Sequence, residues 1–358
     1  MVLNTAFTIF VRCNDYQKNS AMKKYIVLVF LFAIFSLSII SCRPANRFAI
    51  DLSNPVEVNI QRFDKDFILL DTLDIVAGVK QLYEKYPDFF PVFIHDILGL
   101  NPHDTLFVAE QIGVFLTDSL FRNVNKEALK QFEDVRDIEH KLSIAFTYLQ
   151  YYFPEIKLPR IYFFVSGFNS NILLSENLIG MGTDMYLGTD FEAYLKSDIY
   201  RYKLEAMNRQ NLAPDLISAL LFYNFRMRSE QDRLIDHMLY RGKIMFLLSV
   251  IMPNVSDEFL IGYSAEQIQW SRRFERQIWT SIIDQKALFS TDRFLIRQFL
   301  NDAPFTSPIS PDSPGRLGTW IGWQIVRSYM NRNQQITLEE LMRTTDFQRI
   351  LEESGYRP

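Results

Sequence analysis

Apolar residues recur at spacings of three and four along most of this chain, which is the periodicity of helices with a buried face. In the first half the pattern covers residues 73–87, 88–100, 105–121 and 126–154. In the second half it covers residues 213–227, 230–251, 264–289 and 315–332. The chain is therefore predicted to be mainly helical.

Shorter segments of a different pattern lie between these helices. Residues 56–64 alternate apolar and polar side chains, which predicts a strand. Residues 160–168 and 177–188 are short, rich in strand-forming residues and bounded by glycine, so both predict strands of a small sheet. Residues 303–315 carry four prolines and predict an ordered loop or connector. The expected fold class is mainly α (α+β), a helical domain with a small β-sheet.

The N-terminal pattern is that of an export leader. Lys23 and Lys24 precede an apolar run over residues 25–40, which is followed by Ser41 and Cys42. A basic start, an apolar stretch of this length and a small residue before the break are typical of a secretory signal, and the run is short for a transmembrane span. We expect residues 1–41 to be a leader whose true start is Met22.

Residues 39–42 resemble the lipobox of bacterial lipoproteins, which implies that Cys42 becomes the lipidated first residue of the mature chain. Residues 42–54 are then a tether, and residues 55–358 are expected to form a single, mainly helical globular domain. Arg43 and Pro44 stand where surface-exported lipoproteins of the Bacteroides group often carry acidic residues. We therefore expect an anchor in the outer membrane, with the domain facing the periplasm.

Charge and cysteine content narrow the classes of partner. Of 38 basic and 42 acidic side chains, residues 1–41 hold four and one, which leaves a mature net charge of about −7. An acidic domain is a poor partner for nucleic acid, so none is expected. Cys42 is the only cysteine of the mature chain, so stability must come from packing, for which a hydrophobic content of 48% is sufficient.

The segment 230–251 carries the candidate chemistry. Its buried face is predicted to consist of six apolar residues: Leu234, Ile235, Met238, Leu239, Met245 and Phe246. Asp232 and Asp236 lie one turn apart, a spacing that suits acid–base work or a metal but also an ordinary solvated face. His237 lies one turn from Arg233 and from Arg241, and two guanidiniums disfavour a zinc ligand there.

The other histidines, His95, His103 and His140, lie in separate segments without the spacing of a zinc-binding helix. Motifs for a serine nucleophile, a P-loop or a dinucleotide fold are also missing from the sequence. The glycines of residues 180–188 predict tight strand packing, with Asp184 and Asp190 as turn or capping residues. Neither a metal nor a cofactor is expected.

Several segments between residues 143 and 330 resemble the gliding-motility lipoprotein B family of Bacteroidota, above all LIDHMLYRGK and GRLGTWIGWQIVRSYM. That family is distantly similar to zincin metallopeptidases, in which one helix supplies His-Glu-x-x-His and the next a glutamate before a glycine. Here the first helix has neither histidine nor glutamate, and Arg241 precedes Gly242. The resemblance thus implies a degenerate zincin-like scaffold with a vestigial cleft at Asp184, Asp232, Arg233, Asp236, His237 and Arg241.

The function expected is that of a non-catalytic, lipid-anchored envelope protein that binds other envelope proteins in envelope assembly, secretion or motility. Within the cleft, Arg241 is expected to be a structural ion-pair residue. The alternative is a metal-dependent peptidase or other hydrolase with a rearranged site that uses Asp184, Asp232, Asp236 or His237. A further alternative is a periplasmic small-ligand binder that uses its many aromatic residues, although most of these should simply form the core.

Cys42→Ala should release the protein from the membrane, because stable anchoring needs at least two acyl chains and the rest of the mature chain has no anchor of its own. The measurement is the share of protein in the membrane fraction after lysis. Fractionation identical to that of the wild type would contradict the assignment of Cys42 as the lipidation site.

Overall fold

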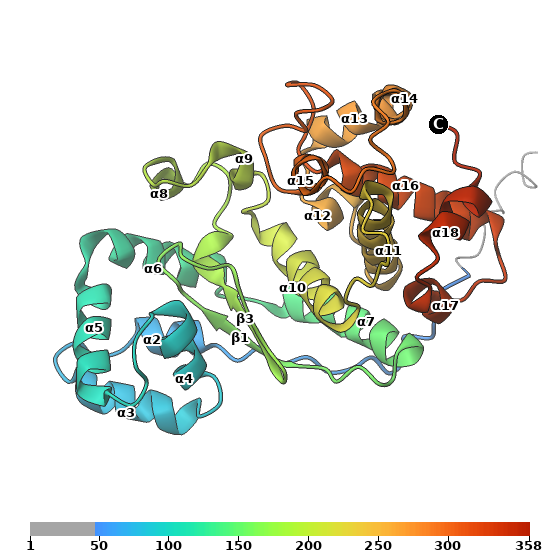
Figure 1. Cartoon of the computed structure of the whole chain (residues 1–358). Helices are drawn as coiled ribbons and strands as arrows, with labels where there is room; N and C mark the ends of the chain where they lie inside the picture. Colours follow the sequence, from blue (N-terminus) through green and yellow to red (C-terminus); the bar gives the residue numbers. More distant parts are fainter. Residues whose placement is uncertain (1–46) are drawn as a thin grey trace, which may run out of the picture. The chain divides into compact units, whose positions relative to one another are not determined.

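The computed structural model describes residues 47–358 (Figure 1). Cys42 and the predicted leader lie outside the described residues. Contacts within the chain separate residues 1–51 from residues 52–358, and the elements below all belong to the second unit. No helix of the part described is long and apolar enough to cross a membrane.

The first helices of the unit precede a small sheet. They are α2 (Phe63–Ile68), α3 (Ile75–Lys85), α4 (Phe90–Val92), the π-helix η1 (Phe93–Ile97), α5 (Thr105–Thr117), α6 (Ser119–Gln131) and α7 (Arg136–Tyr152). Next come β1 (Arg160–Phe164), β2 (Ile172–Ser175), β3 (Leu178–Gly182) and the 3-10 helix η2 (Thr183–Met185). The mainly helical class with a small sheet is confirmed.

The rest of the chain is helical. Its elements are α8 (Glu192–Leu195), α9 (Arg201–Leu204), α10 (Arg209–Asn224), α11 (Leu234–Ile251), α12 (Asp257–Ile261), α13 (Ala265–Arg273), α14 (Glu275–Asp284), α15 (Arg293–Leu300), α16 (Leu317–Arg332), α17 (Leu338–Arg343) and α18 (Phe347–Ser354). The four helices predicted here correspond to α10, α11, the pair α13 and α14, and α16. Most of the helices that the sequence did not predict are short. A helix of only a few residues shows too little periodicity for detection.

Arginine side chains explain why the predicted segment 126–154 is two helices. Arg209 donates to the carbonyl oxygens of Gln131, the last residue of α6, and of Asp134. Arg62 Nη1 donates to the carbonyl oxygen of Phe132 at 2.5 Å. Carbonyl groups at a helix end have no partner within the helix, and cations bind well there. These donors therefore stabilise the end of α6 before α7 begins.

The sheet has the order β1-β3-β2, with β1 parallel to β3 and β2 antiparallel to it. The strand predicted at residues 56–64 is largely wrong. Only Gln61 forms a bridge, to Tyr162 of β1, and a helix begins at Phe63. The amide of Val56 donates to Thr147 Oγ1 and that of Ile60 to Glu139 Oε1, so α7 side chains take hydrogen bonds that a sheet would need.

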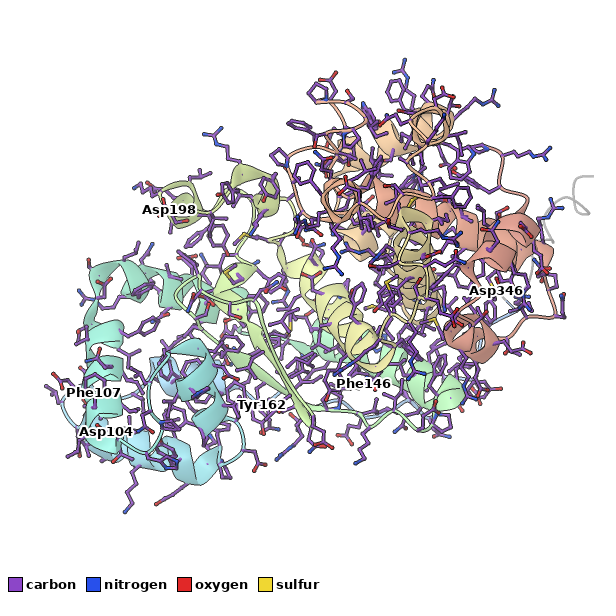
Figure 2. The ribbon with its side chains drawn as sticks, viewed as in Figure 1. Asp104, Phe107, Phe146, Tyr162, Asp198 and Asp346 are labelled. Atoms are coloured by element: carbon purple, nitrogen blue, oxygen red, sulfur yellow. The ribbon has the colours of Figure 1, made fainter. Side chains whose placement is uncertain are left out.

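An aromatic core fixes the first helices against the sheet. Phe63, Phe89 and Phe93 are fully buried and pack on one another at ring-centroid distances of 4.9 to 6.1 Å. Phe89 also stacks on Tyr162 of β1 at 4.3 Å, a residue labelled in Figure 2. Each buried aromatic side chain removes a large apolar area from water, and the ring geometry adds specificity.

The second half is organised around the crossing of α11 and α16. All six residues predicted for the buried face of α11 are buried, and the six large apolar residues of α16 from Trp320 to Tyr329 are at most 1% exposed. The helices meet at glycines. A Cβ atom on Gly322 would lie 1.9 Å from the carbonyl oxygen of Met238, and one on Gly242 would lie 2.3 Å from that of Gly322. The two backbones are in direct contact.

The proline-rich segment 303–315 is an ordered connector, as predicted. Thr306 and Ser313 are buried within it, and the amide of Thr306 donates to Ser313 Oγ at 3.0 Å. Thr306 Oγ1 donates to the carbonyl oxygen of Pro314 at 2.8 Å and accepts from the amide of Leu317 at 3.2 Å. These bonds hold the start of α16 in place.

Gly322→Ala should lower the free energy of unfolding by about 3 kcal/mol or more, because the new methyl group meets backbone atoms that cannot rotate away. Gly113 of α5 is the matched control, since a Cβ atom there has no atom within 4 Å. Gly113→Ala should raise stability by about 0.5–1 kcal/mol, the usual gain from replacing glycine inside a helix. Urea titration measures both, and equal midpoints for Gly322→Ala and wild type would contradict the close crossing.

Candidate functional site

A cavity of about 730 Å³ opens between α10, α11 and the start of α16. The segment 168–172 that leads into β2, the end of η2, the region around α9 and the end of α12 complete its walls. Its polar lining includes Tyr186, Asp215, Arg241, Asp302 and Arg316. Of the residues that the sequence assigned to a vestigial cleft, only Arg241 lines this cavity.

Asp215 is the one charged residue between positions 210 and 225, and α10 presents it to the cavity. Its Oδ2 accepts a hydrogen bond from the hydroxyl of Tyr186 at 2.9 Å. Burial raises the pKa of Asp215 to about 7, against opposing effects of the Tyr186 hydrogen bond and the charge of Arg316. Burial also raises the pKa of Tyr186. The pair therefore consists of a stable phenol and a carboxyl group that titrates near neutral pH.

Both arginines of the cavity donate to backbone carbonyls. Arg316 donates from Nη2 to the carbonyl oxygen of Ile261 at 2.7 Å, and its Nε forms a 2.9 Å ion pair with Asp302. Arg241 donates to the carbonyl oxygen of Leu300, the last residue of α15. Burial, reinforced by the nearby Arg316, lowers the pKa of Arg241.

The ion pair predicted for Arg241 is not formed among residues 47–358. Asp302 pairs with Arg316 instead, and a helix-end carbonyl takes the place of a carboxylate as the partner of Arg241. The Arg241 side chain nevertheless has a bonding partner within the protein, as expected of a residue with a structural role.

Asp232, Arg233, Asp236 and His237 form a separate network at the start of α11. Asp236 is buried and pairs with Arg233 at 2.9 Å, while its Oδ2 accepts from the amide of Arg233 at 3.0 Å. Asp232 precedes the helix in a left-handed conformation, with φ of 52°, and its carboxylate lies 2.7 Å from His237 Nε2. Asp236 thus pairs with Arg233 and Asp232 with the imidazole of His237, so the two aspartates do not act as a pair on one helical face.

Asp184 lies in η2 and is completely buried. It accepts hydrogen bonds from the amides of Ser166 at 3.0 Å and Phe168 at 2.8 Å. Phe168 has a φ of 66°, so the carboxylate holds an unusual turn after β1. Burial raises the pKa of Asp184, against these hydrogen bonds. The geometry is that of a turn-stabilising residue.

The donors in the cavity do not fit zinc. A zinc site needs about four neutral or anionic donors that converge on one point. Here Asp215 is bound to Tyr186, Asp302 is paired with Arg316, and Arg241 brings a cation to the position of the expected glutamate. Within the described part of the chain, no three His, Cys, Asp or Glu side chains gather where they could hold a metal ion.

Sequence reasoning missed Asp215, Tyr186, Asp302 and Arg316. A lone carboxylate in an otherwise uncharged helix was a usable signal for Asp215. Arg316 has a φ of 59° and is the N-cap of α16, a role that sequence does not suggest for arginine. Tyr186 and Asp302 reach the cavity from distant segments, so only the fold could reveal them.

Comparison with known proteins supports the resemblance found in the sequence. The family model described as gliding motility protein GldB matches residues 45–358, a range that contains every element around the cavity. No curated protein and no solved structure matches the chain.

Asp215→Asn tests the raised pKa. In the wild type, the folded state keeps the proton up to about pH 7, whereas the unfolded state releases it at the ordinary value of 3.8. The stabilising contribution is therefore complete below 3.8 and is lost as the pH rises through about 7. Asparagine still accepts from Tyr186 but does not titrate.

The Asp215→Asn variant should be more stable than wild type at about pH 8 and equally stable at about pH 4. The measurement is a series of urea titrations across this pH range. A constant difference between the two proteins at every pH would show that Asp215 has an ordinary pKa.

Proposed function

We propose that this chain, which belongs to the family of the gliding motility protein GldB, is a lipid-anchored envelope protein that acts by binding other envelope proteins. The proposed anchor is Cys42, and the proposed location is the periplasmic face of the outer membrane. The motif at residues 39–42 and the lack of acidic residues directly after Cys42 support these assignments.

Exposed apolar residues on and between the first helices carry the proposal, and together we call them the apolar surface. The loop between α2 and α3 exposes Leu73 by 96%, and α5 exposes Leu106 by 70%. The surface is completed by Leu69, Val76, Phe107, Val114 and Leu120. α5 contacts both α3 and α6, and Figure 2 labels Phe107 on α5. Large apolar groups that gather on neighbouring elements are typical of protein-binding surfaces.

The chemistry of the cavity supports binding rather than catalysis. Arg241 is hydrogen-bonded to a helix end, and Asp302 is neutralised by Arg316, so both groups already serve the structure. A catalytic base or metal ligand must be available to the substrate or the ion. We therefore infer that the cavity is part of a scaffold.

One observation favours the alternative function of a hydrolase with a rearranged site. Asp215 combines a pKa of about 7 with a position in the wall of a large cavity. Carboxyl groups with such a pKa can act as general bases near neutral pH. If the protein is a hydrolase of this kind, Asp215→Asn should abolish its function in cells although the variant folds.

The test is affinity capture from native membranes, with the Cys42 anchor intact. Leu106→Ser/Val114→Ser changes two exposed residues of the apolar surface, and Phe289→Ser/Phe294→Ser is the matched control with two exposed residues elsewhere. The first variant should lose the proteins that the wild type captures, whereas the control should keep them. All three should retain their circular dichroism spectrum.

Equal capture by the surface variant and the control would refute the proposed surface. The same conclusion would follow if the surface variant lost only binding to lipid vesicles, because the apolar residues would then contact membrane rather than protein.

A further inference from the structure

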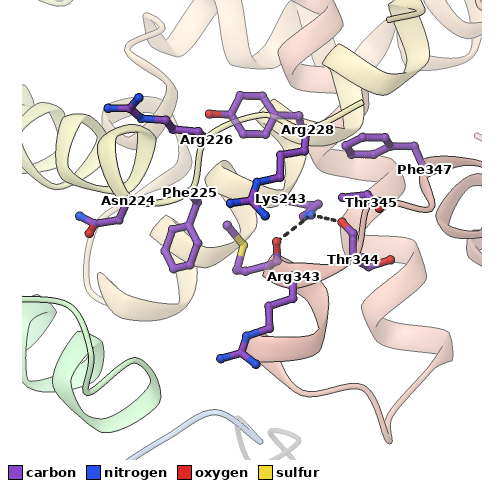
Figure 3. A pocket seen from close by; sticks show the side chains of 11 residues that line it. Asn224, Phe225, Arg226, Arg228, Lys243, Arg343, Thr344, Thr345 and Phe347 are labelled. Carbon is purple, nitrogen blue, oxygen red and sulfur yellow. Dashed lines mark hydrogen bonds between the residues drawn. The ribbon is translucent and has the colours of Figure 1, made fainter. Parts of the chain in front are cut away.

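A second, smaller cavity lies on the other side of α11, with a volume of about 410 Å³. Figure 3 shows it from close by. Its walls are the segment 224–228 after α10, the middle of α11, and the segment 342–347 that joins α17 to α18. It shares no lining residue with the 730 Å³ cavity.

The lining is basic. Four cationic side chains, Arg226, Arg228, Lys243 and Arg343, line this cavity, and no carboxylate does. The whole chain has a net charge of −4, so a concave site with four positive and no negative groups departs strongly from the average surface. Such a site concentrates anions.

Lys243 lies at the base of this site and is only 3% exposed. Its Nζ donates to the carbonyl oxygens of Thr344 at 2.7 Å and Met342 at 3.1 Å, as the dashed lines in Figure 3 show. Two carbonyls satisfy two of its three protons, and Nζ also lies 5.4 Å from the centroid of the Phe347 ring. Burial lowers the pKa of Lys243 to about 8, which still leaves it mainly charged at neutral pH.

The arginines at the mouth are available for a ligand. Arg226 and Arg228 are exposed, and neither forms an ion pair among residues 47–358; Arg226 lies only over the ring of Tyr223, at 5.8 Å. Arg343 pairs with Glu339 at 2.8 Å, but both side chains are more than half exposed, so this pair is weak. Thr345 adds a hydroxyl group to the lining.

We propose that this basic cavity binds a phosphate group, carried by a small molecule or by a lipid headgroup. A carboxylate offers one charge and two acceptor oxygens, whereas a phosphate offers up to two charges and several oxygens in different directions. The cavity offers two exposed guanidiniums, a buried ammonium group and a threonine hydroxyl on three chain segments. These donors match the charges and oxygens of a phosphate better than those of a carboxylate. The site is separate from the apolar surface and does not rest on the proposed function.

The test uses Arg226→Gln/Arg228→Gln, which changes two exposed side chains and should leave the fold intact. The control is Arg293→Gln/Arg297→Gln, because both of these arginines are exposed on α15 and lie outside the cavity. All proteins carry Cys42→Ala, so that an acyl anchor cannot contribute. Ionic strength is held constant because screening weakens all exposed charges alike.

Two arms distinguish the sources of phosphate. Calorimetric titration with glycerol 3-phosphate measures binding to a soluble phosphate. Co-flotation with phosphatidylcholine vesicles that contain phosphatidylglycerol measures binding to a lipid headgroup. Binding in either arm, with a loss of at least about tenfold for the cavity variant and none for the control, supports the proposal and identifies the source. Lys243→Met should weaken binding in the same arm.

The proposal is overturned if neither arm shows binding, or if the control loses as much affinity as the cavity variant. The second result would mean a diffuse electrostatic attraction without a defined site. These outcomes are independent of the protein-capture experiment, because none of the variants changes the apolar surface.

Discussion

The contact between the backbones of Gly242 and Gly322 is the constraint on which the second half of the molecule depends. No side chain separates α11 from α16 at this point, so the orientation of α11 is closely limited. Successive helical residues point about 100° apart. Arg241 consequently lines the larger cavity, Gly242 forms the crossing, and Lys243 lines the basic cavity.

Carbonyl groups at helix ends, as well as carboxylates, bind cations in the interior and at the cavities of this protein. Arg241 donates to the last residue of α15, Arg316 to the last residue of α12, and Lys243 to carbonyls at the end of α17. Arg209 does the same at the end of α6. The last carbonyls of a helix lack partners within the helix and carry its negative partial charge, so a cation is stabilised there without a buried carboxylate. Lys243 of the basic cavity is therefore held without a carboxylate partner.

Periodicity was sufficient for the long helices, because burial of one face imposes a regular spacing on the residues themselves, and strand-forming composition located β1 and β3. It failed where hydrogen bonds from elsewhere decided the structure. Residues 56–60 have the alternation of a strand, yet side chains of α7 bind amides at Val56 and Ile60. In the segment 126–154, arginines from distant positions stabilise a helix end that the periodicity does not show.

Local patterns in the amino-acid sequence were enough for the helical class and the family resemblance, and they predict an export leader with a candidate lipidation site at Cys42. These properties reside in local patterns, which a chain carries before it folds. The packing of the helices then set which polar groups meet. It joined Asp215 to Tyr186, directed Arg241 to a helix end, and gathered Arg226, Lys243 and Arg343 around one cavity. Partners that lie 29 and 59 residues apart, or on three separate segments, are selected by packing geometry, and no local spacing encodes that.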